Sequence, residues 1–81
     1  MIHVHFFAQT RELIGEARIE VEPSFESVEA LRAQLASQGD KWALALEQQR
    51  VLAAVNQTLV SLEHPLCDGD EVAFFPPVTG G

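Results

Sequence analysis

The C-terminal residues combine a stiff base with a narrow tip that could carry a reactive group. Pro76-Pro77 precede Val78-Thr79-Gly80-Gly81, and no residue follows in the sequence. Proline favours extended backbone, so the diproline is expected to direct this tail away from the domain. Glycine has no Cβ, so Gly80-Gly81 would fit a channel too narrow for side chains. We therefore expect Gly81 to present a free α-carboxylate inside the active site of another protein. The plainer alternative is a frayed chain end.

The histidines and the cysteine are weaker candidates for chemistry. His3 and His5 share one face of a predicted strand, and His64 could in principle add a third metal ligand. Nothing in the sequence places His64 near them, so a half-exposed sheet face is the better interpretation and we expect no metal site. Cys67 lies beside Asp68-Gly69-Asp70, and neighbouring anions raise the pKa of a thiol. No nucleophile triad, P-loop or dinucleotide motif is present, so we expect no complete active site in this chain.

The composition is that of one small acidic globular domain. The chain has 81 residues, of which 47% are hydrophobic and 21% charged, and its formal net charge is −7. Phosphates would repel this charge, which argues against nucleic-acid and anionic-membrane partners. One cysteine cannot form an internal disulfide, which fits a reducing compartment. The N-terminus lacks the pattern of a signal peptide, and no apolar run approaches the ~20 residues of a membrane span. We expect a cytoplasmic protein.

Hydrophobic periodicity predicts an α+β fold, with a domain at 1–75 and a tail at 76–81. Period-two alternation indicates strands, and a helical apolar spacing follows a Ser27 N-cap and ends at Gly39. Asp40 could cap a short second helix. One long helix would cover one face of a mixed sheet of about five strands, with the last strand at its centre. The expected strands are 2–7, 16–22, 51–55, 58–62 and 71–75, with a short helical turn or loop at 8–14 closed by Gly15, a long helix from Ser27 and a short helix at 41–47.

A partner-binding patch follows from the same alternation. Ala17, Ile19 and Val21 are expected to point inward on the second strand. One helix covers one face of the sheet, so the outward apolar side chains Phe7, Leu59 and Phe75 would stay exposed. A contiguous exposed apolar patch marks a protein interface, and Arg11 could lie at its polar rim. The alternative is that the short segments fold over this face.

The sequence resembles the small, sulfur-carrier subunits of molybdopterin synthase, which are ubiquitin-like β-grasp proteins. The resemblance covers essentially the whole chain, and the tail is its most specific part. The motifs that carry it are Phe6-Phe7-Ala8, Arg11-Glu12-Leu13-Ile14-Gly15, Val28-Glu29-Ala30-Leu31-Arg32, Ala54-Val55-Asn56-Gln57, Asp68-Gly69-Asp70-Glu71-Val72-Ala73 and Phe74-Phe75-Pro76-Pro77-Val78-Thr79-Gly80-Gly81.

The resemblance implies a cycle of chemistry at Gly81. An adenylyltransferase similar to ubiquitin-activating enzymes would use ATP to attach AMP transiently at Gly81, and a sulfur donor protein would then produce a thiocarboxylate. The tail, with Gly80 next to the reactive residue, would enter the large catalytic subunit and donate sulfur to cyclic pyranopterin monophosphate. The family assembles as a heterotetramer in which this chain would be the non-catalytic, sulfur-donating subunit of a sulfurtransferase. No permanently bound cofactor is implied, and partner contacts would come from Phe7, Arg11, Leu59, Phe75, Pro76, Pro77, Val78 and Thr79.

Three other functions fit parts of the pattern. A sulfur carrier for another pathway, such as thiamine thiazole synthesis, would use the same tail with a different acceptor. A ubiquitin-like protein modifier would become joined to lysines through Gly81. A plain interaction domain would leave the tail inert. The Phe-Phe-Pro-Pro-Val-Thr segment favours the molybdopterin assignment.

Overall fold

The computed structural model describes residues 1–77, which form five strands and three helices. None of the three helices has the length and apolar character that crossing a bilayer requires. The strands are β1 (Ile2–Phe6), β2 (Arg18–Val21), β3 (Leu52–Val55), β4 (Thr58–Val60) and β5 (Glu71–Phe75). The helices are α1 (Ala8–Ile14), α2 (Val28–Ala36) and α3 (Asp40–Ala45).

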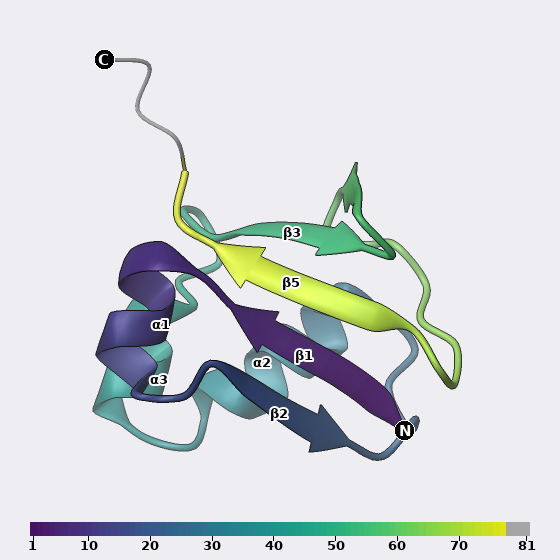
Figure 1. Cartoon of the computed structure of the whole chain (residues 1–81), viewed down its shortest axis with the longest axis horizontal. Helices are drawn as coiled ribbons and strands as arrows, with labels where there is room; N and C mark the ends of the chain where they lie inside the picture. Colours follow the sequence, from purple (N-terminus) through teal and green to yellow (C-terminus); the bar gives the residue numbers. More distant parts are fainter. Residues whose placement is uncertain (78–81) are drawn as a thin grey trace.

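The five strands form one mixed sheet in the order β2-β1-β5-β3-β4 (Figure 1). β5 pairs with β1 in parallel and with β3 antiparallel, so the last strand lies at the centre of the sheet. The outer pairs, β1–β2 and β3–β4, are both antiparallel. This arrangement confirms the predicted α+β, ubiquitin-like β-grasp fold and the central place of the last strand.

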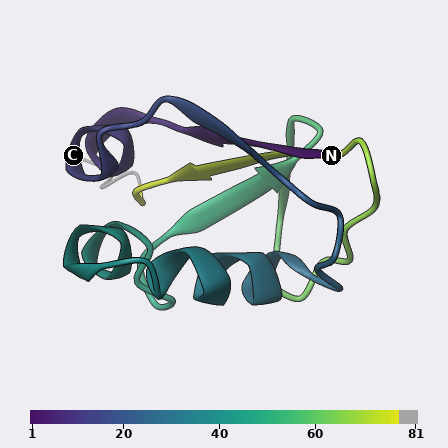
Figure 2. The same ribbon diagram turned by 90° about the horizontal axis from the view of Figure 1, so that it is seen from below.

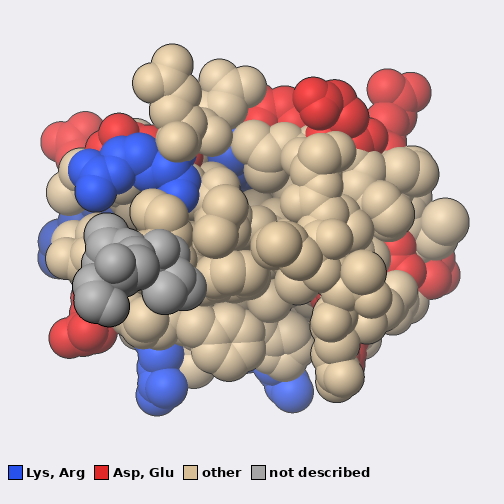
Figure 3. Space-filling view, turned by 90° about the horizontal axis from the view of Figure 1, so that it is seen from above, with Lys and Arg blue, Asp and Glu red and all other residues tan. Residues whose placement is uncertain are grey.

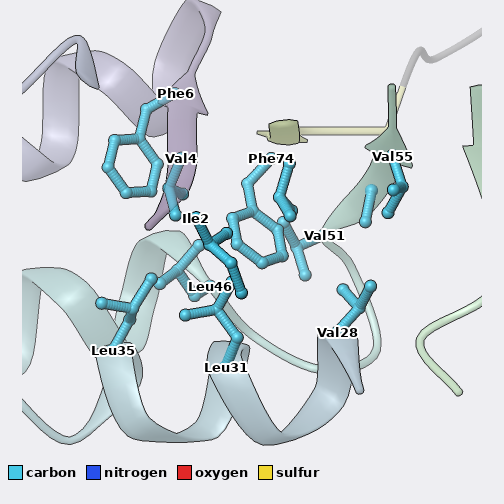
Figure 4. Close-up of a cluster of buried hydrophobic side chains, with 12 residues drawn as sticks. Ile2, Val4, Phe6, Val28, Leu31, Leu35, Leu46, Val51, Val55 and Phe74 are labelled. Atoms are coloured by element: carbon cyan, nitrogen blue, oxygen red, sulfur yellow. The ribbon is translucent and has the colours of Figure 1, made fainter. Parts of the chain in front are cut away.

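The core lies between one face of the sheet and the helix layer beneath it (Figure 2). Alternating residues of β1 and β5 are buried on this face, as the period-two pattern predicts. On α2, Val28, Leu31 and Leu35 share one helical face and are also buried. Figure 4 shows Leu31 and Leu35 of α2 directed towards Ile2 and Phe74 of the sheet. The opposite face of the sheet has no helix over it in the described chain (Figure 2).

The two short helices lie together at the end of the sheet where β5 finishes (Figure 1). Phe6 of β1 contacts Trp42 of α3 edge to face, with 5.7 Å between ring centroids. Helix α1 ends as predicted at Gly15, whose φ of 86° is the left-handed conformation that glycine adopts without strain. These contacts fix the region next to the C-terminal tail.

Some predicted element boundaries are wrong, for identifiable reasons. Helix α2 ends at Ala36 rather than Gly39, because Ser37 caps it with its N–H and its hydroxyl donates to the Gln34 carbonyl at 2.6 Å. Gly39 has φ 163°, which is extended backbone, and it is the N-cap of α3, so Asp40 is the first helical residue and not the cap. The Ala17 side chain is exposed, because β2 and its inward alternation begin only at Arg18.

An arginine joins the two helices of the lower layer. Arg32 Nε and Nη2 each donate to the Glu29 carboxylate at 2.7 Å, and Nη1 donates to the Leu46 carbonyl at 2.7 Å. The guanidinium therefore links α2 to the residue that follows α3. Hydrogen bonding from Arg32 lowers the pKa of Glu29 below its ordinary value.

Replacing this arginine will destabilise the domain in a pH-dependent way. Arg32→Met keeps the apolar stem but removes three charge-assisted hydrogen bonds, so we expect the free energy of unfolding to fall by ~1–2 kcal/mol at neutral pH. The folded-state pKa of Glu29 is lowered. The stability that Glu29 contributes is therefore fully present above its unfolded-state pKa and is lost as the pH falls through its folded-state pKa. Urea titrations at neutral and acidic pH should show the difference between wild type and variant shrinking on acidification. A difference that stays constant with pH would contradict the role given to Glu29.

Candidate docking face and tail root

The central strand leads directly into the diproline, which we call the tail root (Pro76-Pro77). β5 is held by neighbours on both sides, and Phe7 N–H donates to the Phe74 carbonyl at 3.1 Å close to its end. Pro76 is half-buried and Pro77 is exposed. The tail therefore begins from rigid structure. The remaining predicted tail residues, Val78, Thr79, Gly80 and Gly81, lie outside the described residues.

The predicted patch residues lie on the open face of the sheet. The Phe7 side chain is 51% exposed and that of Leu59 is 65% exposed, whereas Phe75 is half-buried. The strand register places Leu52 beside Phe75 and Ala54 between Leu59 and Ala73. One apolar surface thus crosses three strands and extends to the residue after β1. We call it the docking face, made of Phe7, Leu52, Ala54, Leu59, Ala73 and Phe75.

Small residues at the middle of the docking face make it concave. Ala54 and Ala73 are adjacent in the register, while the larger Phe7 and Leu59 stand towards the margins. A shallow hollow beside Ala73 is bounded by His5, Phe7 and Gln57. A concave apolar centre with bulky margins suits a convex surface of another protein.

Sequence reasoning named only three of the six docking-face residues. Leu52, Ala54 and Ala73 were missed, although the strand parity that identified Leu59 applies to them as well. Arg11 lies exposed on α1, where its carbonyl accepts the Gly15 N–H at 2.8 Å. It is therefore on the helix that follows Phe7, consistent with a rim position.

The three histidines have separate surroundings. His3 Nδ1 lies 2.9 Å from Glu20 Oε2 across the β1–β2 pair, and the His5 ring stacks on Phe7 with 6.3 Å between centroids. His64 is in the β4–β5 connection, where its carbonyl accepts the Val28 N–H at 3.0 Å. Within residues 1–77, no three His, Cys, Asp or Glu side chains are grouped as metal ligands.

A polar network closes the end of the domain opposite the tail root. The N-terminal ammonium binds Asp68, which lowers the pKa of that carboxyl. Asp70 accepts from Asn56 Nδ2 at 3.0 Å and from the Cys67 N–H at 2.8 Å. Cys67 is a free, exposed thiol in this turn. These contacts join β1 to the turn before β5, so we assign them a structural role.

Charge is unevenly distributed over the face that Figure 3 shows. Figure 3 shows a broad uncharged surface at the centre of the view, with Asp and Glu at the upper right and right margins and both acidic and basic side chains at the left margin. Arg50, in the loop before β3, lines a cavity together with both prolines of the tail root. Glu47 lines the same cavity, so a cationic and an anionic side chain both lie beside the tail root.

Comparison with known proteins gives concordant matches. Residues 4–81 match the model of the ThiS family. The molybdopterin synthase sulfur carrier subunit of Escherichia coli K12 is 68% identical over 81 residues, which is 100% of both chains. A putative molybdopterin converting factor subunit 1 from Pyrococcus furiosus is 32% identical, with a TM-score of 0.76 over 95% of this chain and 97% of that chain. A chain in the complex of subunits 1 and 2 of molybdopterin-converting factor from Helicobacter pylori is 28% identical, with a TM-score of 0.66 over 99% and 97%.

Proposed function

Since this chain belongs to the ThiS family, as a sulfur carrier subunit of molybdopterin synthase, we propose that Gly81 is the residue that carries the sulfur. The observation that carries this proposal is the course of β5. The central strand is paired on both sides and runs without interruption into Pro76-Pro77. A tail that begins from the most constrained strand can be aimed by the domain as a whole.

The chemistry at Gly81 requires activation, because a carboxylate resists attack by nucleophiles. An adenylyltransferase would join a carboxylate oxygen to the α-phosphate of ATP and release pyrophosphate. A sulfur donor protein would then replace AMP, which leaves with that oxygen, and the product would be a thiocarboxylate. Its sulfur is a nucleophile, and two rounds of transfer would supply both dithiolene sulfurs to cyclic pyranopterin monophosphate.

The docking face would bind the large synthase subunit and the adenylyltransferase in turn. Both proteins must take up the same tail, and Phe75 joins the docking face to the tail root, so one partner would exclude the other. Docking makes sulfur transfer effectively intramolecular, which can lower the activation free energy by up to ~7–11 kcal/mol when the geometry is right. The solved complex from Helicobacter pylori supports pairing with the large subunit. We infer a heterotetramer built on a dimer of large subunits.

The catalytic residues of this sulfurtransferase would therefore come from the partners. This chain acts as a group carrier, with AMP attached only transiently and no resident cofactor. Its net charge of −7 would help to steer it towards basic surfaces around a partner's tail channel. We place the reaction in the cytoplasm, where the single thiol would stay reduced.

The test is the intact mass of the chain after incubation with the adenylyltransferase, ATP and a sulfur source. Exchange of one carboxylate oxygen for sulfur should add ~16 Da, the change expected of a thiocarboxylate group carrier. Oxidation adds nearly the same mass, so the shift must map to Gly81 and be absent without ATP. An unchanged mass, with the adenylyltransferase shown to be active, would refute the proposal.

A further inference from the structure

A second recess, with both polar and apolar walls, lies beside the tail root but away from the docking face. It is a cavity of about 200 Å³ between α1 and α3, and its walls include Leu13, Leu44, Ala45, Arg50 and both prolines of the tail root. None of the six docking-face residues lines it. We call it the α1–α3 pocket.

The walls of this pocket are held in place by the fold. Helix α1 is fixed at its C-terminal end by the Gly15 cap, and α3 is anchored by Trp42 against Phe6 and by fully buried Leu46. The loop after α3 is closed by two hydrogen bonds to the Glu47 carbonyl, from Arg50 N–H at 3.0 Å and from Val51 N–H at 2.9 Å. The pocket is therefore formed before any partner arrives.

Leu44 contributes an exposed apolar side chain to the walls of this pocket. Its side chain is 57% exposed, although its helix neighbours Trp42 and Ala45 pack against the core. Leu44 lies together with Leu13, Ala45 and the two prolines in the walls of one recess, and exposed apolar side chains gathered at one place on the surface are typical of a contact site. Arg50 and Glu47 supply a polar rim around it.

We propose that the α1–α3 pocket receives an apolar side chain of the large molybdopterin synthase subunit. This inference rests on the proposed function. A protein that takes up the tail comes close to Pro76-Pro77, and these prolines line the pocket while the preceding Phe75 belongs to the docking face. The large subunit would therefore contact the tail root from two sides, through the docking face and through the α1–α3 pocket. Contacts on two sides restrict the direction in which the tail enters the active site.

Leu44→Glu tests the proposal, with Ala43→Glu as its matched control. Both residues are exposed on α3 and both changes add one negative charge, but Ala43 does not line the pocket. We expect Leu44→Glu to raise the Kd for the purified large subunit at least ~10-fold, which corresponds to ~1.4 kcal/mol. Ala43→Glu should stay within about twofold of wild type. Thermal unfolding of each variant verifies the fold.

Leu44→Gln separates loss of apolar contact from added charge, and it should also weaken binding. The proposal is overturned if both Leu44 variants bind like Ala43→Glu, or if only the charged variant binds weakly. Failure of the wild-type chain itself to bind the large subunit would instead refute the proposed function. These results are distinguishable in one titration series by calorimetry.

Discussion

Adding one alanine after Gly81 will abolish sulfur transfer while leaving the fold and the docking face intact. The extra residue moves the carboxylate beyond the position at which the adenylyltransferase activates it and places a Cβ where the tip must be thin. We expect the rate of dithiolene formation in a reconstituted synthase reaction to fall at least ~10³-fold, as positioned reactions lose when the reacting group is displaced. The melting temperature should match that of the wild type.

Cys67→Ser is the control for this experiment, because Cys67 is the only thiol in the chain and it is exposed. A carrier that held sulfur as a persulfide on this cysteine would lose activity in Cys67→Ser and keep it in the extended chain. We expect the reverse. Normal transfer by the extended chain would show that Gly81 is not the sulfur-bearing residue.

Leu59→Asp will weaken binding of the large subunit and of the adenylyltransferase by at least ~100-fold. A buried, unpaired carboxylate in an apolar interface costs several kcal/mol, and ~2.7 kcal/mol already corresponds to 100-fold in Kd. The Leu59 side chain is 65% exposed in the free chain, so the substitution should change the free energy of unfolding little. Binding should be measured separately for each partner by calorimetry.

Thr58→Asp is the matched control on the same strand. Thr58 pairs with Val55, whose side chain belongs to the buried face of the sheet. Thr58 and Leu59 therefore point to opposite faces of β4. We expect this variant to bind both partners within about threefold of wild type. Equal loss in both variants would assign the effect to charge alone, and no loss in Leu59→Asp would remove the docking face from the interface.

The docking face was predictable because it depends on local alternation. Leu59 follows from the parity of β4, and Phe7 obeys the parity of β1 although the strand ends at Phe6, because Phe7 keeps extended dihedrals of φ −126° and ψ 154°. The pairing register of the strands was not needed to identify these residues. It was needed only to show that they lie on one continuous surface. The proposed tail chemistry stays a prediction, and it could be made from the sequence because it depends on the order of residues and not on their packing.

The α1–α3 pocket could not be predicted from the sequence. Its lining comes from three separate segments, and only the packing of α1 against α3 brings them together. The outward position of Leu44 could have been predicted from helical spacing. Trp42 and Leu46 are four residues apart and share one helical face, whereas Leu44, two residues from each, lies on another. The end of α2 was misplaced because the Ser37 cap competes with the glycine signal two residues later.

If the tail enters a partner's channel as proposed, withdrawing it would pull β5 along its own axis. The parallel β1 and antiparallel β3 flank this strand, and Met1 lies at the end of the domain opposite the tail root (Figure 1). Such a force shears both hydrogen-bond ladders at once, so the bonds share the load and do not open one after another. The domain therefore resists traction at its tail far better than it would with β5 at an edge. Under the proposed cycle, a carrier built this way would be pulled free after each delivery and refilled without unfolding.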